Sequence, residues 1–414
     1  MRVAVVGSGI SGLTATWLLR KRHEVTLFEA GERFGGHTHT RMLALPEGPE
    51  PVDTGFIVYN DRNYPTLERL FSALSIEGRP TGMSFSLSDE RSGLEYAGHS
   101  VAGLFAQKRR LLSPTFWGML RDILRFNRAA PALLATPGEG PLLGAFLAEG
   151  GYGEAFAEHY LLPMGAAIWS VPTKGLRAFP AKRIIEFFEN HGLLSLKNRP
   201  QWYVVKGGSS AYLAPILATL PPARQRLATP VRGLRRGEAG VRVRSDASEE
   251  LFDAIVLACH SDEALALLDD ASPEERAVLG ALRYQKNDVV LHCDEALLPR
   301  AAKARAAWNY RVSAAGAEQA TVTYWMNTLQ HLKTKTPVLV TLNQSEAIRS
   351  EKVFERLSYA HPIFDAPALV AQGRFSEING QRQTYYCGAY WRYGFHEDGC
   401  ASALRALNAL GWDW

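Results

Sequence analysis

"MRVAVVGSGISGLTATWLLRKRHEVTLFEA", residues 1–30, decides the fold class. "RVAVV" at 2–6 is a short β-branched run typical of a buried parallel strand. "GSGISG" follows at once and places glycines at positions 7, 9 and 12, where they permit a tight turn, close approach to a pyrophosphate and close helix packing. The amides that open the next helix stabilise an anion. This order predicts a dinucleotide-binding unit.

A second strand, "EVTLFEA" at 24–30, supports the same interpretation. It leads to Glu29, twenty residues after Gly9, where an acid accepts hydrogen bonds from a ribose diol and disfavours a 2′-phosphate. Strand, glycine loop, helix, strand and acid in this order are far more specific than a glycine motif alone. The residues that we expect at the dinucleotide are Gly7, Gly9, Ile10, Ser11, Gly12, Glu29 and Ala30.

"GERFGGHTHT", residues 31–40, follows the acid directly and offers two histidines. A metal site is one interpretation of His37 and His39. Their spacing favours no common metal site, and neither has a third ligand nearby in the sequence, so we predict no metal. The Gly-Gly pair at 35 and 36 instead indicates a second phosphate-binding turn.

The two glycine turns together resemble the flavin amine oxidase, phytoene desaturase and protoporphyrinogen oxidase superfamily. Its fingerprint runs from the first strand to Gly-Gly-Arg-x-x-Ser/Thr, which Gly35, Gly36 and Thr40 match, while His37 stands where the superfamily usually has arginine. The resemblance implies FAD as cofactor. It places Gly35, Gly36, His37 and Thr38 in the pyrophosphate cradle.

Three later segments extend the resemblance. "PVDTGFIVYN" at 51–60 is similar to a turn that leads back toward the flavin, although by itself it could be an ordinary strand and turn. "QWYVVKGGSSAYLAPILATL" at 201–220 resembles a strand, Gly-Gly and helix segment, and Val231 matches a position whose backbone pairs with adenine. "TYYCGAYWRYGFHEDGCASALRAL" at 384–407 resembles the closing segment. There the resemblance implies that Gly388, Phe395 and His396 contact the cofactor, while Ala389 replaces an acid that often follows the glycine.

Candidate catalytic residues lie in "YGFHEDG", residues 393–399. A histidine between an aromatic residue and two carboxylates can act as acid or base, and aromatic side chains can wall the flavin. We therefore expect His396, Glu397 and Tyr393 to be catalytic. The alternative is that Glu397 and Asp398 cap the following helix. The nearby cysteines at 387 and 400 leave covalent flavin attachment open.

The chain of 414 residues is long enough for two or three domains. Because two long stretches interrupt the cofactor segments, we predict an α/β fold with a discontinuous Rossmann-type FAD-binding domain and an inserted mixed α+β substrate domain. The FAD-binding domain comprises residues 1–59, 201–270 and 376–414. The substrate domain comprises residues 60–200 and 271–375.

Charge and hydropathy bear on location and partners. A net charge of +4 gives no case for nucleic-acid binding, and no run of 18 apolar residues predicts a spanning helix. Four scattered cysteines and the lack of a recognisable signal sequence predict a cytoplasmic protein. A helix expected within 113–134, preceded by "QKRR" at 107–110, has an apolar stripe and a basic face. It could be an ordinary solvated helix or lie on the inner membrane face.

The closest resemblance is to bacterial predicted NAD/FAD-binding proteins with phrases such as "GGHTHT", "VDTGFIVYN" and "GFHEDG". Their genes often lie beside those for cyclopropane-fatty-acyl-phospholipid synthase-like methyltransferases, and one relative is linked to oxygen-independent desaturation in furan fatty acid formation. The resemblance implies desaturation of a methylated, phospholipid-linked acyl chain and a lipid methyltransferase as partner. The apolar segments at 160–170 and 322–332 could line an acyl tunnel or form plain core. The alternatives are an oxidase of amines or other small lipophilic molecules, and a non-catalytic flavoprotein partner of the methyltransferase.

Overall fold

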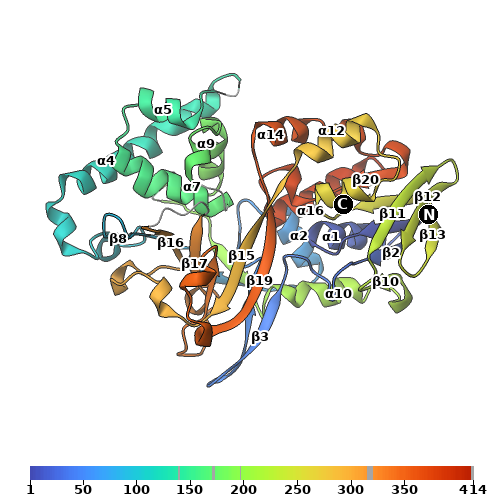
Figure 1. The fold of residues 1–414 in the computed structure, drawn as a ribbon, viewed down its shortest axis with the longest axis horizontal. Helices are drawn as coiled ribbons and strands as arrows, with labels where there is room; N and C mark the ends of the chain where they lie inside the picture. The colour runs from blue at the N-terminus through green and yellow to red at the C-terminus, as the bar shows by residue number, and fades with distance from the viewer. Residues whose placement is uncertain (139, 170–172, 196, 315–319, 412–414) are drawn as a thin grey trace.

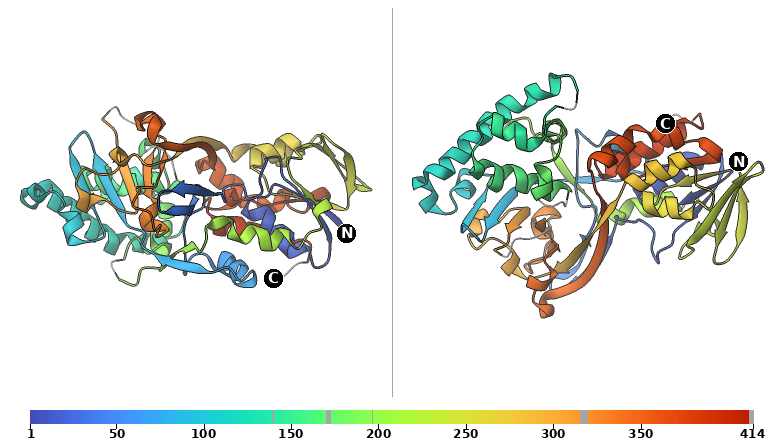
Figure 2. Two further views of the ribbon diagram at one scale, coloured as in Figure 1. Left: turned by 90° about the horizontal axis from the view of Figure 1, so that it is seen from below. Right: turned by 45° about the horizontal axis from the view of Figure 1, so that its top comes forward.

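The computed structural model describes residues 1–414 except 139, 170–172, 196, 315–319 and 412–414. Both ends of the chain lie in one part of the molecule, and a layer of helices forms the opposite end (Figure 1). Two long strands, β15 (Tyr284–His292) and β19 (Val353–Pro362), run between these parts. The further views in Figure 2 keep the helical layer and the part with the termini at opposite ends.

A five-stranded parallel sheet organises the part with the termini. Its strands, in spatial order, are β10 (Gln225–Arg226), β2 (Glu24–Phe28), β1 (Arg2–Val6), β14 (Ala254–Leu257) and β20 (Thr384–Tyr386). All four pairings are parallel. The central strands are buried because helices cover a parallel sheet on both faces, which explains their continuous apolar sequences.

Helices from distant parts of the sequence pack around this sheet. They are α1 (Ile10–Leu19), α2 (Pro65–Ala73), α10 (Leu213–Leu217), α11 (Ser261–Leu267), α12 (Pro273–Ala281), α14 (Ala366–Gly373), α15 (Phe375–Ile378) and α16 (His396–Asn408). Three small sheets accompany them: β3 (Thr40–Leu45) with β4 (Gly48–Asp53); β5 (Tyr59–Asn60), β9 (Trp202–Val205) and β6 (Gly78–Thr81); and β11 (Val231–Gly237), β12 (Gly240–Ser245) and β13 (Glu249–Phe252). The Rossmann-type prediction is thereby confirmed.

The inserted part contains a seven-stranded mixed sheet. Its strands, in spatial order, are β19, β15, β18 (Leu339–Leu342), β17 (Thr321–Trp325), β16 (Trp308–Val312), β7 (Phe85–Asp89) and β8 (Leu94–Ala97). The helices are α3 (Val101–Leu104), α4 (Pro114–Ala129), α5 (Leu143–Glu149), α6 (Glu154–Phe156), α7 (Leu162–Trp169), α8 (Thr173–Leu176), α9 (Ala181–Asn190) and α13 (Met326–Leu329). A π-helical turn, Ala157–Leu161, joins α6 to α7. None of the helices in the described part of the chain has the length and apolar composition of a membrane span.

The chain crosses between the two parts at positions that differ from the predicted boundaries. Leu67, Leu70 and Phe71 of α2 lie in the core around the parallel sheet, although residues 60–200 were assigned to the substrate domain. α12, α14 and α15 also contribute to that core, although they fall wholly or partly within the predicted substrate segment 271–375. The apolar faces of these helices decide the boundary, because each is buried against the sheet or its helices.

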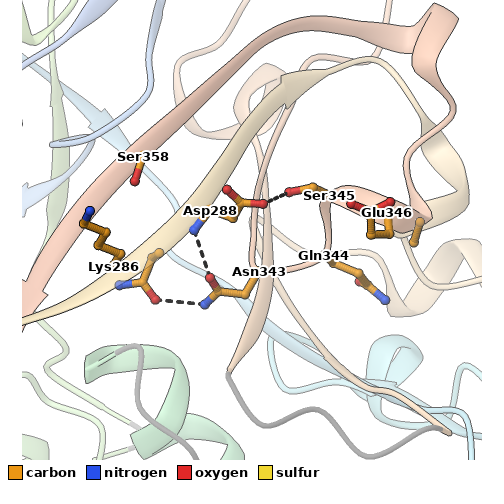
Figure 3. Close-up of a pocket in the computed structure, with 9 residues that line it drawn as sticks. Lys286, Asp288, Asn343, Gln344, Ser345, Glu346 and Ser358 are labelled. Atoms are coloured by element: carbon orange, nitrogen blue, oxygen red, sulfur yellow. Dashed lines mark hydrogen bonds between the residues drawn. The ribbon is translucent and has the colours of Figure 1, made fainter.

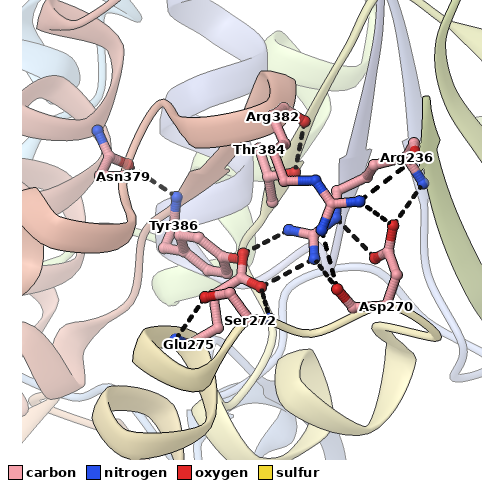
Figure 4. Close-up of polar contacts among 8 residues, drawn as sticks. All are labelled: Arg236, Asp270, Ser272, Glu275, Asn379, Arg382, Thr384 and Tyr386. Carbon is pink, nitrogen blue, oxygen red and sulfur yellow. Dashed lines mark hydrogen bonds and ion pairs between the residues drawn. The ribbon is translucent and has the colours of Figure 1, made fainter. Parts of the chain in front are cut away.

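A buried ion-pair network fastens the edge of the parallel sheet (Figure 4). The Arg236 side chain, only 1% exposed, places Nη2 2.8 Å from Glu275 Oε2 and Nε 2.8 Å from Asp270 Oδ1. The Tyr386 hydroxyl donates to Glu275 at 2.6 Å. Burial raises the pKa of Glu275, but the Arg236 guanidinium outweighs it and lowers this pKa to about 2. The network therefore joins β11, α12 and β20 through one arginine, its two carboxylate partners and a tyrosine hydroxyl.

Candidate functional site

The first glycine turn brings α1 close to the strand that precedes it. Gly7 has φ +98°, and a Cβ at Gly12 would lie 1.9 Å from the Gly7 carbonyl oxygen, so a larger residue fits at neither position. The N-cap, Gly9, has open space where a Cβ would stand and no side-chain cap bond. The first amides of α1 therefore have no side-chain acceptor from the cap, which is the arrangement that binds a phosphate.

The second glycine turn lies directly against the first. Gly36 has φ +58°, and a Cβ there would lie 2.9 Å from Gly9 Cα. The Arg33 guanidinium holds this turn by donating to the carbonyl oxygens of Gly36 at 2.6 Å and Thr38 at 2.9 Å. Sequence reasoning missed Arg33, which places a permanent positive charge beside the cradle although position 37 lacks arginine.

Glu29 is oriented by the same loops. Its carboxylate accepts hydrogen bonds from the Ser8 N–H at 3.0 Å, the Ser8 hydroxyl, and the Gly31 N–H at 2.8 Å. A carboxylate has about four acceptor sites, so capacity remains for a ribose diol. The adjacent Ala30 is exposed, and Val231 begins β11 as a buried residue.

Helix α16 closes the site from the C-terminal end of the chain. A Cβ at Gly399 would lie 2.6 Å from Ile10 Cγ2, so this glycine allows α16 to contact the start of α1. His396, the first residue of α16, stacks on Phe56 with ring centroids 3.7 Å apart, and its Nε2 lies 3.0 Å from Thr38 Oγ1. Burial lowers the pKa of His396 to about 3, so its imidazole is neutral near pH 7.

His37 faces a group of aromatic rings. Its ring centroid lies 5.0 Å from that of Tyr359, 5.5 Å from that of His361 and 6.2 Å from that of His260. Burial, followed by the neighbouring His361 and His260, holds the pKa of His37 well below its ordinary value. Among the described residues, no group hydrogen-bonds the buried His37 Nε2 atom. This orphaned nitrogen fits a site whose missing partner is the cofactor.

Asp53, from the segment "PVDTGFIVYN", connects three distant segments. Its carboxylate accepts from the Thr40 hydroxyl at 2.6 Å, from the Ser209 N–H at 2.8 Å and from Gln330 Nε2 at 2.8 Å. Burial raises the pKa of Asp53 to about 6, and the hydrogen bonds oppose that increase. The second glycine turn, the Gly207-Gly208 loop and the substrate domain therefore share one acceptor. These four residues lie in segments that the sequence analysis singled out, but local spacing does not show that Asp53 meets the other three.

Two of the three predicted catalytic residues, Glu397 and Tyr393, hydrogen-bond to other helices. Glu397 accepts from the Leu67 N–H at 2.9 Å and the Thr66 N–H at 3.1 Å, so it caps α2 rather than its own helix. The Tyr393 hydroxyl donates to Glu186 of α9 at 2.7 Å. Glu397 and Tyr393 therefore connect helices in this structure. Of the three predicted catalytic residues, His396 is the one that lies beside the second glycine turn, next to Thr38. Asp398 accepts from the Phe395 N–H at 2.9 Å and caps α16, as the alternative interpretation has it.

The closing aromatic loop is part of the core. Tyr390 and Trp391 are 2% and 5% exposed, which does not suit the expected aromatic wall. A Cβ at Gly388 would lie 2.0 Å from the Tyr390 ring. Cys387 and Cys400 are buried free thiols, and burial raises the pKa of both, which disfavours the thiolate.

His39, just before β3, contacts the same tyrosine, Tyr359, that lies beside His37. Its Nδ1 atom lies 3.0 Å from the Tyr359 hydroxyl and 3.2 Å from the Thr54 hydroxyl. Burial lowers its pKa to about 4. In the described ranges, no cluster of three or more His, Cys, Asp or Glu side chains could hold a metal ion.

A cavity of about 620 Å³ lies on the substrate sheet (Figure 3). Its lining residues are Lys286, Asn287, Asp288, Asn343, Gln344, Ser345, Glu346, Ala347 and Ser358. Asn343 Nδ2 donates to Asn287 Oδ1 at 2.9 Å, and Asn287 Nδ2 lies 3.1 Å from His361 Nδ1. The cavity thus adjoins the histidines around His37. Its polar lining gives no wall for an acyl chain.

These turns, the acid after the second strand and the closing helix define the class of FAD-binding flavoproteins with a Rossmann-type domain. The chain belongs to the flavin-containing amine oxidoreductase family, whose model matches residues 10–311. It is therefore an FAD-dependent oxidoreductase. FAD would be held by the two glycine turns, Glu29, His37 and the start of α16.

Solved structures share the whole fold. A CLA-producing fatty acid isomerase from P. acnes is 16% identical, with a TM-score of 0.70 and 98% of each chain covered. Cyclohexylamine oxidase from Brevibacterium oxydans IH-35A is 16% identical, with a TM-score of 0.68 and 99% of each chain covered. Putrescine oxidase bound to putrescine is 14% identical, with a TM-score of 0.68 and 100% of each chain covered. At these identities, the likeness shows the fold alone.

Proposed function

We propose that this flavoprotein desaturates a fatty-acyl chain, namely a methylated acyl group carried on a phospholipid. Membership of the family supplies the redox chemistry, and one protein of the same fold bears the name of a fatty acid isomerase. When bound, FAD can accept the two electrons and two protons that the acyl chain loses as its double bond forms.

Half-buried aromatic and apolar side chains of the substrate sheet and the helical layer carry this proposal. Large side chains there pack on the core but remain partly exposed: Phe85, Tyr160, Ile168, Trp308 and Tyr324. The Trp308 ring lies 5.6 Å from Phe85 and 6.1 Å from Tyr324, centroid to centroid. Tyr160 stands on the π-helical turn, a feature frequent at functional sites. Apolar and aromatic side chains grouped in this way suit contact with a hydrocarbon chain.

Two carboxylates, Asp89 and Glu186, bear on the choice between an apolar substrate and an ammonium ion. Glu186 accepts from the Tyr393 hydroxyl, and Asp89 lies 3.1 Å from His159 Nε2 and accepts from Ser92 at 2.9 Å. A buried ammonium group needs a carboxylate or a comparable partner. Because Asp89 and Glu186 already have protein partners, an ammonium ion would have to share these carboxylates with them.

The test compares lipids in cells with, without and again with the gene. We expect a methylated saturated acyl chain to accumulate on deletion and its unsaturated product to return on re-expression, as measured by mass spectrometry. The purified FAD-loaded protein should also bleach anaerobically with methylated phospholipid. An unchanged lipid profile would contradict the proposal.

A second candidate is oxidation of an amine or another small lipophilic molecule, which the fold of cyclohexylamine oxidase favours. Anaerobic bleaching by cyclohexylamine but not by phospholipid would select it. Failure of both substrates, together with tight binding to a lipid methyltransferase, would point to a non-catalytic partner.

A further inference from the structure

The end of the helical layer exposes apolar and basic side chains together. On α4, Trp117, Arg121, Leu124 and Arg128 follow at helical spacing i, i+4, i+7 and i+11 and therefore share one face. The preceding 3₁₀ helix, Lys108–Leu112, adds Leu111 and Leu112. We call these six residues the tip surface. Leu112 is 88% exposed, Leu124 52% and Trp117 49%.

The tip surface differs from the face that α4 buries. Phe116, Met119 and Phe126 are at most 3% exposed and hold the helix on the core. Trp117 is fixed at the surface, because its Nε1 donates to the Leu111 carbonyl oxygen at 2.9 Å and its ring centroid lies 5.3 Å from that of Phe105. The exposed apolar residues are thus displayed by ordered structure, and such exposure marks an interaction site.

The charge around the tip surface has one sign. Between His99 and Arg128 the chain has six basic residues, at 108, 109, 110, 121, 125 and 128, and one acid, Asp122, a net of +5. Asp122 is buried, accepts from the Gly153 N–H at 2.8 Å and lies 3.3 Å from Arg125. On α6, which packs against α4, Glu154 is paired with Arg177. The surface therefore complements an anionic partner.

We propose that the tip surface docks on an anionic phospholipid bilayer, with Leu112, Leu124 and Trp117 in the interfacial region. Basic residues beside exposed leucine and tryptophan are the composition of interfacial membrane helices. A nucleic acid would match the charge but would leave the leucines against water. α4 lies at the end of the molecule away from the parallel sheet, where a flat surface can reach it (Figure 1). The inference goes beyond the proposed function and holds for any substrate.

The test measures co-sedimentation of the FAD-loaded full chain with vesicles at low salt. We expect binding to vesicles of about 70% phosphatidylcholine and 30% phosphatidylglycerol, weak binding to pure phosphatidylcholine, and release at high salt. Each lysine or arginine near an anionic surface contributes about a fivefold gain in binding, so R121Q/R128Q should bind about 25-fold more weakly. L112D/L124D should abolish binding. These lipids are not the proposed substrate, so failure here is distinguishable from failure of the desaturation proposal.

The controls carry comparable changes outside the tip surface. R79Q/R276Q removes two exposed arginines on β6 and α12, and Val370→Asp places a charge on α14 at a site 67% exposed. Both should bind vesicles as the unaltered chain does, and all variants should keep the flavin spectrum and melting temperature. Equal vesicle binding by R121Q/R128Q and its control would overturn the proposal. Tight binding to a DNA duplex without binding to vesicles would also overturn the proposal.

Discussion

His37 stands at the position where the superfamily fingerprint that the sequence resembles has arginine. Its Nε2 is buried without a hydrogen-bond partner in the described chain, and it follows the glycine turn directly. The Nε2 atom of the His37 imidazole can make one hydrogen bond to the cofactor. Arg33 supplies the permanent charge beside it, although its donors are used by the carbonyl oxygens of the turn.

We predict that His37→Ala folds normally but binds FAD roughly tenfold or more weakly, because a hydrogen bond to a charged group contributes about 1.5–3 kcal/mol. His37→Arg should retain FAD. Fluorescence titration of the FAD-free protein measures the dissociation constant, with the exposed His99→Ala as control. Unchanged FAD binding by His37→Ala would show that the positive charge of the site lies elsewhere.

At Asp53, a single carboxylate serves donors from three segments. Asp53→Asn would turn an N–H₂ group toward Ser209 or Gln330, leaving one donor unpaired. We expect a loss of about 1–3 kcal/mol in the free energy of unfolding, measured by urea denaturation. Asp61→Asn, at an exposed site, is the control. A variant as stable as the unaltered chain would mean that the three segments hold one another without Asp53.

At the scale of elements, Arg236 and Glu275 join β11 to α12 and, through Tyr386, to β20. Glu275→Ala leaves a buried guanidinium with only Asp270 to balance it, so we expect a loss of about 3–5 kcal/mol in the free energy of unfolding. The melting temperature measures the effect. The exposed pair Arg232–Asp246 is the matched control, and Asp246→Ala should leave the melting temperature nearly unchanged because solvent screens exposed ion pairs. Comparable losses in both variants would contradict the role of burial.

Other elements show how far local sequence patterns reach. The strands β1 and β2 and the helices α1, α4 and α16 lie where β-branched runs, glycine turns and helical spacing predict them. Glu397 shows the limit. Its neighbours in the sequence indicate a cap for α16 or a catalytic acid, whereas packing of α2 against α16 gives it the backbone amides of Thr66 and Leu67.

At the scale of the molecule, buried neutral histidines make the FAD-free protein sensitive to acid. Burial holds the pKa of His37 well below its ordinary value and lowers the pKa to about 4 for His39, His191, His292 and His361 and to about 3 for His396. In the unfolded chain these groups bind protons near pH 6.5, so the free energy of unfolding falls as the pH drops from about 6.5 to about 4. Asp53 and Asp398, with pKa values raised by burial to about 6 and 7, act in the opposite direction but are fewer.

We therefore expect the melting temperature to fall steeply between pH 6.5 and pH 4. Calorimetry in matched buffers measures it, and His191→Gln should flatten the curve. A melting temperature that stays constant or rises over this range would show that the buried carboxyl groups outweigh the histidines.

The sequence alone determined the cofactor-binding unit, because a glycine turn between a strand and a helix, followed by an acid, depends on contacts within some thirty residues. It also predicted the discontinuous α/β fold and FAD. Only the tertiary structure decided which side chains meet: Asp53 with Ser209 and Gln330, His37 with His260 and His361, and Glu397 with α2. Those contacts join residues up to 331 positions apart, and local spacing carries no record of them.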